Sequence, residues 1–203
     1  MILQCPSEDE NPSMDQNISS FENDFQREFI SSGYEQRGEP LWECQITLTA
    51  SQLKRLDVVP FLVSVTSQID GEKTNSKVFL VLSELFNNAL DHGVLKLSSA
   101  LKHQAEDMEA YYDEREKRME KLVQGKVEMH LEKFRSDAGY LMKIHFKDSG
   151  EGFDFAALEK ISYSNAQKYR HGRGIPLLEG ICNALQYLGN GSEVIAYLEL
   201  PVP

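Results

Sequence analysis

Residues 126–147 read KVEMHLEKFRSDAGYLMKIHFK, and they decide the fold because two runs of alternating residues flank a short polar turn. The apolar positions are Val127, Met129 and Leu131 in the first run, and Met142, Ile144 and Phe146 in the second. A period of two predicts strands with one buried and one wet face, over 126–134 and 140–147. Because Ser136 to Gly139 supply a turn, the stretch predicts a β-hairpin.

Similar patterns predict the elements on either side of this hairpin. Alternation predicts strands over 41–50 and 192–200. Apolar residues at helical spacing predict helices over 57–69, 76–92, 155–161 and 174–188, with Asp57 as an N-cap and Gly93 as a stop. The order predicts an α/β fold, a two-layer α/β sandwich in which helices cover one face of a mixed, largely antiparallel sheet.

A long charged segment between the second helix and the hairpin predicts a helical insertion at about 97–123. Its apolar positions follow steps of four and three, and Arg115 breaks the series: Leu101, Ala105, Met108, Tyr112, Met119 and Leu122. This spacing predicts a helical hairpin arm or a short coiled-coil seam. We interpret the charged run 114–118 as a solvated face with i,i+4 ion pairs.

Composition limits the class of protein. The chain has 203 residues, and 21 Lys and Arg against 32 Asp and Glu give a net charge of −11, which argues against general binding to nucleic acid. Residues 1–38 are polar with isolated apolar positions, so we expect a linker or tail with one short helix over 21–30. The alternative is an arm that packs on the domain or binds a partner. Residues 39–203 are expected to form one domain.

Cysteine usage and hydropathy indicate the compartment. Cys5, Cys44 and Cys182 are far apart and lack metal-binding spacing, so neither a disulfide framework nor a zinc site is predicted. The longest apolar stretch, 58–65, is far shorter than a membrane span, and no signal peptide is recognisable. We therefore expect a cytoplasmic protein that does not bind membranes.

Three short segments carry the candidate chemistry. In 84–93, ELFNNALDHG, Glu84 and Asn88 are four apart and so project from one helix face, as a carboxylate that can accept a proton and an amide oxygen that can bind Mg²⁺. In 148–153, DSGEGF, Asp148 follows a strand and can accept a hydrogen bond from an exocyclic amino group. In 171–178, HGRGIPLL, glycines open a helix whose free N–H groups suit phosphates.

Each segment alone also has a plain structural explanation. These explanations are an exposed polar helix face, an Asp/Gly turn and a glycine-rich N-cap, respectively. In this order, however, the three segments resemble those of the Bergerat-fold (GHKL) ATPases, and most closely the anti-sigma-factor serine kinases of the RsbW and SpoIIAB type. The resemblance covers roughly residues 42–200. The helical insertion is similar to one in the ATPase-like C-terminal domain of some bacterial response regulators fused to a SpoIIE-type phosphatase.

The resemblance implies a role for each matching residue. Glu84 is the implied general base for an attacking serine hydroxyl, and Asn88 the ligand of Mg²⁺ on the triphosphate of ATP. The implied adenine site comprises Asp148, Gly150, Gly152 and Ser192, where Ser192 stands at a frequent threonine position. The implied phosphate site comprises Arg170, Gly172, Arg173 and Gly174. The lid at about 163–171 is short for the family.

The expected function is therefore an ATP-dependent serine/threonine protein kinase and anti-sigma regulator that phosphorylates a small antagonist protein in a partner-switching pathway. One alternative is a nucleotide-responsive module that sequesters the antagonist or a sigma factor with little catalysis. Another is the regulatory domain of a larger phosphatase fusion, with residues 1–38 as the interdomain linker. A histidine autokinase is disfavoured because nothing before Trp42 supplies a phosphoacceptor helix, and His92 is better interpreted as a capping group. Family members commonly form homodimers.

Overall fold

The computed structural model describes residues 39–70, 76–98, 108–137, 139–155 and 174–201. Contacts divide the chain into two units, 1–38 and 39–203, and the fold below is that of the second unit. The tail helix predicted over 21–30 lies outside the described residues, as does all but Phe155 of the helix predicted over 155–161.

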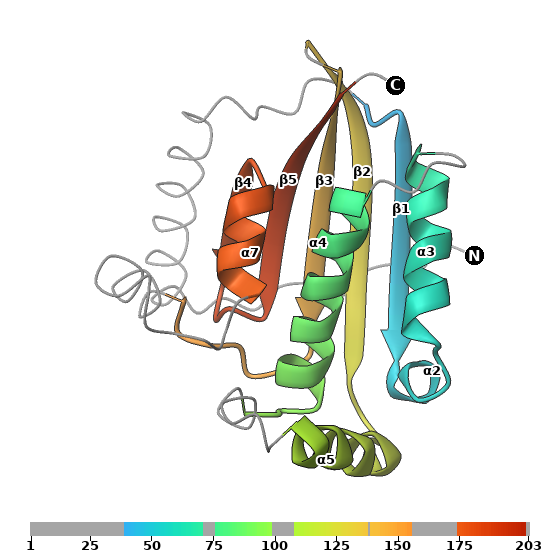
Figure 1. The fold of residues 1–203 in the computed structure, drawn as a ribbon, viewed down its shortest axis with the longest axis vertical. Helices are drawn as coiled ribbons and strands as arrows, with labels where there is room; N and C mark the ends of the chain where they lie inside the picture. Colours follow the sequence, from blue (N-terminus) through green and yellow to red (C-terminus); the bar gives the residue numbers. More distant parts are fainter. Residues whose placement is uncertain (1–38, 71–75, 99–107, 138, 156–173, 202–203) are drawn as a thin grey trace, which may run out of the picture. The chain divides into compact units, whose positions relative to one another are not determined.

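The described strands form one antiparallel sheet in the order β1-β2-β3-β5-β4 (Figure 1). Their bounds are Trp42–Thr49 for β1, Lys126–Ser136 for β2, Gly139–Asp148 for β3, Ala184–Leu188 for β4 and Glu193–Pro201 for β5. The predicted strands at 41–50, 126–134, 140–147 and 192–200 are confirmed.

The β2–β3 hairpin anchors the core through its register. Met129 pairs with Phe146 and Leu131 with Ile144, so these side chains share one face of the sheet. All four are almost completely buried. Gly139 closes the hairpin at φ 144°, a conformation that favours glycine. The alternating apolar residues of these two strands thus form the sheet side of the core.

Three helices lie across one face of this sheet (Figure 1). They are α3 (Val58–Asp70), α4 (Ser76–Asn87) and α7 (Gly174–Ile181). The central helix, α4, buries five apolar side chains against the sheet: Val78, Val81, Leu82, Leu85 and Phe86. A short helix, α2 (Ala50–Leu53), follows β1 and was not predicted. The fold class is therefore α/β, an antiparallel sheet with helices, consistent with the predicted sandwich.

The prediction that Gly93 ends the second helix is wrong. The chain passes from α4 directly into a π-helical turn, η1 (Asn88–Val94), so Gly93 lies inside the helical segment. The Leu95 N–H donates to the Leu90 carbonyl, five residues earlier, at 2.8 Å. Glycine is required here for a different reason, which is the close approach of a side chain described below.

The single helix predicted over 174–188 is also wrong. α7 ends at Ile181, and Ala184–Leu188 is the edge strand β4, which pairs with β5 through contacts such as Tyr187 with Val194. Gly189 and Gly191, both at positive φ, make the turn between these strands. The apolar run fitted a helical period, but ladder hydrogen bonds to β5 decide its conformation.

The predicted helical insertion is confirmed only in part. The structure describes α5 (Met108–Lys121), places Leu97 in a non-helical segment, and leaves 99–107 outside the described residues. The predicted apolar face is wrong at Met108 and Tyr112, which are 42% and 58% exposed whereas Tyr111 is 2% exposed. Its later positions, Met119 and Leu122, are partly buried and pack against the core. Hydrogen bonds from Tyr111 and Arg115, together with these apolar contacts, set the packed side of α5, as shown below.

The charged run of α5 is not simply a solvated face. Arg118 makes the expected i,i+4 ion pair with Glu114, Nε to Oε1 at 2.6 Å. Arg118 and Arg115 also bond to the turn that follows α4, so both arginines contribute to packing. Within the described part of the chain, no helix has the length and apolar character needed to cross a membrane.

Candidate functional site

The first and second candidate segments meet at Gly93 and Asp148. A Cβ atom at Gly93 would lie 2.3 Å from the carboxyl carbon of Asp148, so any side chain at this position would displace the carboxylate. A Cβ atom at Gly150 would lie 2.5 Å from the Gly93 carbonyl oxygen. Segments more than fifty positions apart therefore pack backbone against backbone, and both glycines are needed for that approach.

Asp148 is held at the end of β3 by two backbone hydrogen bonds. Its N–H donates to the Ser192 carbonyl at 2.9 Å, and its Oδ1 accepts the Gly150 N–H at 2.7 Å. Burial raises the pKa of the Asp148 carboxyl to about 6, and the Gly150 hydrogen bond opposes this shift. The carboxyl group is thus fixed and partly desolvated, which suits it to accept a hydrogen bond from a ligand.

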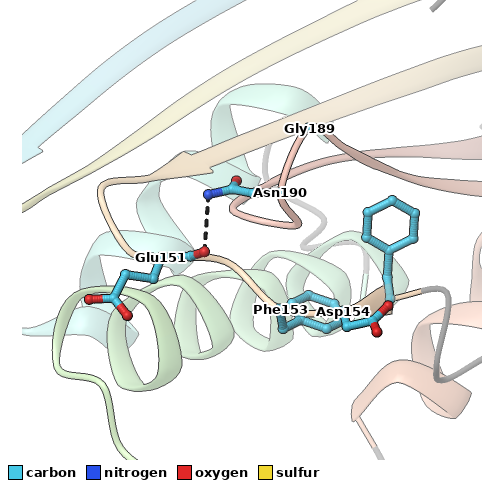
Figure 2. Close-up of a pocket in the computed structure, with 6 residues that line it drawn as sticks. Glu151, Phe153, Asp154, Gly189 and Asn190 are labelled. Carbon is cyan, nitrogen blue, oxygen red and sulfur yellow. Dashed lines mark hydrogen bonds between the residues drawn. The ribbon is translucent and has the colours of Figure 1, made fainter. Parts of the chain in front are cut away.

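Gly152 and Ser192 are linked by a residue that sequence reasoning missed, Asn190. Gly152 has φ +72°, and a Cβ atom there would lie 2.1 Å from the Asn190 carbonyl oxygen. The Asn190 side chain donates from Nδ2 to the Glu151 carbonyl at 3.0 Å (Figure 2). Its Oδ1 accepts a hydrogen bond from the Ser192 hydroxyl at 2.8 Å. A Gly-Asn-Gly turn between strands is a recognisable signal, but the helix predicted over 174–188 obscured it.

Glu84 brings the first segment against the third. A Cβ atom at Gly174 would lie 1.8 Å from Glu84 Oε1, so the Glu84 carboxylate rests on the first turn of α7. Tyr187 is close enough to Glu84 to be affected by its charge: burial raises the pKa of the Tyr187 hydroxyl, and nearby groups that include Glu179 and Glu84 raise it further. Asn88 is half-buried and begins η1. Glu84 therefore lies at the N-terminus of α7, where the first backbone N–H groups of a helix have no acceptor within the helix.

The predicted residues fall into two groups. One group consists of Asp148 and Gly150, which pack on Gly93. The other consists of Glu84 and Gly174, which pack on each other. Gly152 and Ser192 join the first group through Asn190. Arg170, Gly172 and Arg173 lie outside the described residues, as does the predicted lid.

A pocket of about 360 Å³ lies beside this arrangement, and it does not coincide with the predicted site. Its lining residues are Glu151, Phe153, Asp154, Phe155, Gly189 and Asn190 (Figure 2). Phe153 and Phe155 both contact the Tyr187 ring, at centroid distances of 5.1 and 5.9 Å. Because no predicted site residue lines this pocket, we base the assignment on the close packing of the glycines.

The Asn88 amide oxygen can serve as a ligand of Mg²⁺ only when phosphate groups of a nucleotide supply further ligands. Among the described residues, no three His, Cys, Asp or Glu side chains gather in a metal-binding group. A Mg²⁺ ion on a nucleotide needs only one or two protein oxygens, because phosphates and water complete its coordination. One amide oxygen at Asn88 is compatible with that arrangement.

Comparison of the chain with models of known protein families finds no match, and comparison with curated proteins finds none either. The functional assignment therefore depends on the residues themselves.

We expect Gly93→Ala, but not Gly180→Ala, to lower the free energy of unfolding. Both glycines are helical, but a Cβ atom at Gly93 meets the Asp148 carboxylate, whereas at Gly180 it meets nothing within 4 Å. Urea unfolding should show a loss of about 1–3 kcal/mol for Gly93→Ala and no loss, or a gain of up to about 1 kcal/mol, for Gly180→Ala. Equal effects of the two changes would contradict the close packing.

The raised pKa of Asp148 predicts a pH dependence of stability. The ordinary value is 3.8 and the folded value about 6, so the folded state retains the proton that the unfolded chain releases. The stabilising contribution is full below the unfolded pKa and is lost as pH rises through about 6. Relative to Asp148→Asn, which does not titrate, the wild type should lose on the order of 1 kcal/mol across this window, allowing for solvent screening. A constant difference between the two proteins in urea unfolding at several pH values would refute this assignment.

Proposed function

We propose that this chain is an ATP-binding protein of the Bergerat type, and that it acts as a serine/threonine protein kinase on a small antagonist protein. The observation that carries the proposal is the packing of Asp148 and Gly150 against Gly93. Three segments that resemble the ATP-binding segments of this family make close contacts in pairs. An exposed polar face, a turn and a helix cap with unrelated roles would not require such contacts.

Asp148 is the proposed adenine ligand. Its carboxylate is fixed by the Gly150 N–H and partly desolvated, so a hydrogen bond from the amino group of adenine is worth more there than in water. Gly152, at positive φ, leaves the adjacent wall without a side chain. Ser192 contributes a hydroxyl that Asn190 orients. This set favours a flat base with an exocyclic amino group.

The first turn of α7 is the proposed phosphate site. Gly174 begins this helix, whose free N–H groups and positive end attract anions. The family resemblance adds Gly172 as a backbone donor, and Arg170 and Arg173 as cations that offset charge on the transferred phosphoryl group. An acidic chain with a net charge of −11 needs such local positive groups to hold a triphosphate.

Glu84 and Asn88 are the proposed reactive groups. Glu84 rests on Gly174, beside the proposed phosphate site, where its carboxylate can accept the proton of an attacking serine hydroxyl. Asn88 supplies an amide oxygen to Mg²⁺, which neutralises charge on the triphosphate when bound. The implied partners are the antagonist protein and a sigma factor in a partner-switching pathway.

Exposed apolar side chains on α5 favour a second role, sequestration of a protein partner without catalysis. Met108 and Tyr112 lie on this helix, and Val123 follows it with 86% of its surface exposed. Such side chains are common at protein interfaces. The two functions are compatible, and loss of phosphoryl transfer with partner binding retained would separate them. A regulatory role within a longer phosphatase fusion is the remaining alternative.

Calorimetric titration with ATP and Mg²⁺ tests the nucleotide site. We expect saturable, Mg²⁺-dependent binding that Asp148→Asn weakens by at least about tenfold, because a hydrogen bond to a charged group is lost. Asp137→Asn is the matched control, since Asp137 is an exposed carboxylate at the opposite end of the same hairpin. Absence of wild-type binding at millimolar ATP, or equal weakening by both changes, would overturn the proposal.

Transfer of the labelled γ-phosphate of ATP to a cognate antagonist protein tests the reaction. We expect Glu84→Gln to reduce transfer by at least about a hundredfold while ATP binding is retained, because the amide cannot accept the proton. Glu179→Gln, at an exposed position on α7, is the control and should leave transfer unchanged. Undiminished transfer by Glu84→Gln would remove Glu84 as the base.

A further inference from the structure

Asp91 is a buried carboxylate on η1 to which the proposed reaction assigns no role. It is only 4% exposed, and both of its oxygens are hydrogen-bonded. The Tyr111 hydroxyl donates to Oδ2 at 2.6 Å, and Arg115 Nε donates to Oδ1 at 2.7 Å. Both donors come from α5. A buried carboxylate is costly unless it is paired, so η1 depends on α5 for this compensation.

A third side chain of α5 holds the backbone just after η1. Arg118 Nη1 donates to the Leu95 carbonyl at 3.0 Å and to the Lys96 carbonyl at 2.5 Å. Tyr111, Arg115 and Arg118 are separated by four and three residues, and so they share one face of α5. We call these three side chains the α5 clamp. The clamp binds one side chain within η1, that of Asp91, and two carbonyl groups just after η1.

The residues that the clamp holds are close in sequence to Gly93, which contacts the proposed adenine site. Asp91 is two residues before Gly93, whose backbone is in contact with the Asp148 carboxylate. Lys96, beyond Gly93, forms an ion pair with Glu151 in the segment that carries Asp148. Because the Gly93 contact leaves no spare space, a small displacement of η1 changes the position of the Asp148 carboxylate.

We infer that Asp91 is a positioning residue for the nucleotide site, and that the α5 clamp sets the affinity for nucleotide by fixing Gly93 against Asp148. The inference rests on the proposed function, because it assigns α5 a role in ATP binding at that site. It gives the helical insertion a task beyond stability. It also places the control of ATP affinity on side chains that do not touch the nucleotide.

Tyr111→Phe and Tyr112→Phe form a matched test of this inference. The two residues are neighbours on α5 whose rings are in edge contact, 5.7 Å between centroids, but Tyr112 is 58% exposed. Tyr111→Phe removes the hydroxyl that binds Asp91 and keeps the ring. Calorimetry with ATP and Mg²⁺ should show affinity about three- to tenfold lower for Tyr111→Phe and unchanged for Tyr112→Phe.

A spectroscopic readout separates positioning from general stability. The backbone amide resonance of Gly93, recorded on the folded protein well below its melting temperature, should shift in Tyr111→Phe and not in Tyr112→Phe. Arg115→Met, which keeps the aliphatic stem but removes the donor to Asp91, should reproduce both effects of Tyr111→Phe. It provides an independent variant if Tyr111→Phe does not fold.

The outcomes distinguish this inference from the proposed function. If the wild type binds ATP but Tyr111→Phe and Arg115→Met bind it equally well, with the Gly93 resonance unmoved, the clamp serves stability alone and the inference is wrong. If the wild type binds no ATP, the proposed function fails, and the inference about nucleotide affinity fails with it.

Discussion

The close approach of the Gly93 backbone to the Asp148 carboxylate is the constraint on which the remaining geometry depends. It joins the helical layer to the end of β3, at the point where the sheet gives way to loops. It excludes a side chain at Gly93 and at Gly150, and it leaves the Asp148 carboxyl partly desolvated, with its pKa raised to about 6. The Gly93 contact, together with the hydrogen bonds to Ser192 and Gly150, therefore fixes the Asp148 carboxylate in place.

The surrounding structure supports this contact from two sides. On the sheet side, the Asp148 N–H donates to Ser192, and Asn190 links Ser192 to Glu151. On the helical side, a buried acid, Asp91, is neutralised by donors from α5. Polar networks of this kind are rigid when every member is paired, because an unpaired buried group is costly. The proposed site is thus held by hydrogen bonds at its rim and by apolar packing beneath it.

The sequence predicted those parts of the fold that are governed by local periodicity. Alternation located β2 and β3 to within two residues at each end, because each strand has one buried and one exposed face. The helical period failed at Ala184–Leu188, where pairing with β5 rather than local spacing decides the conformation. Local periodicity also failed on part of the packed face of α5, because buried Tyr111 and half-buried Arg115 are held there by hydrogen bonds to Asp91, some twenty positions away.

The candidate site shows the same division. Asp148, Gly150 and Gly152 were selected through their resemblance to a family segment, because aspartate and glycine after a strand also form ordinary turns and do not indicate a site on their own. Gly93 was selected for the wrong reason, as a helix stop, since its true partner is distant in the chain. Asn190 was missed because the helix predicted over 174–188 obscured its Gly-Asn-Gly turn. Asp91 could not be selected, because a lone acid on a helix acquires its role only from tertiary contacts.

The most direct test of this account is a crystal structure of the protein with Mg²⁺ and a non-hydrolysable ATP analogue. The account predicts that the adenine amino group donates to the Asp148 carboxylate and that the triphosphate lies at the first turn of α7, beside Glu84. A nucleotide bound instead in the pocket of Phe153 and Phe155, with Asp148 unengaged, would contradict it.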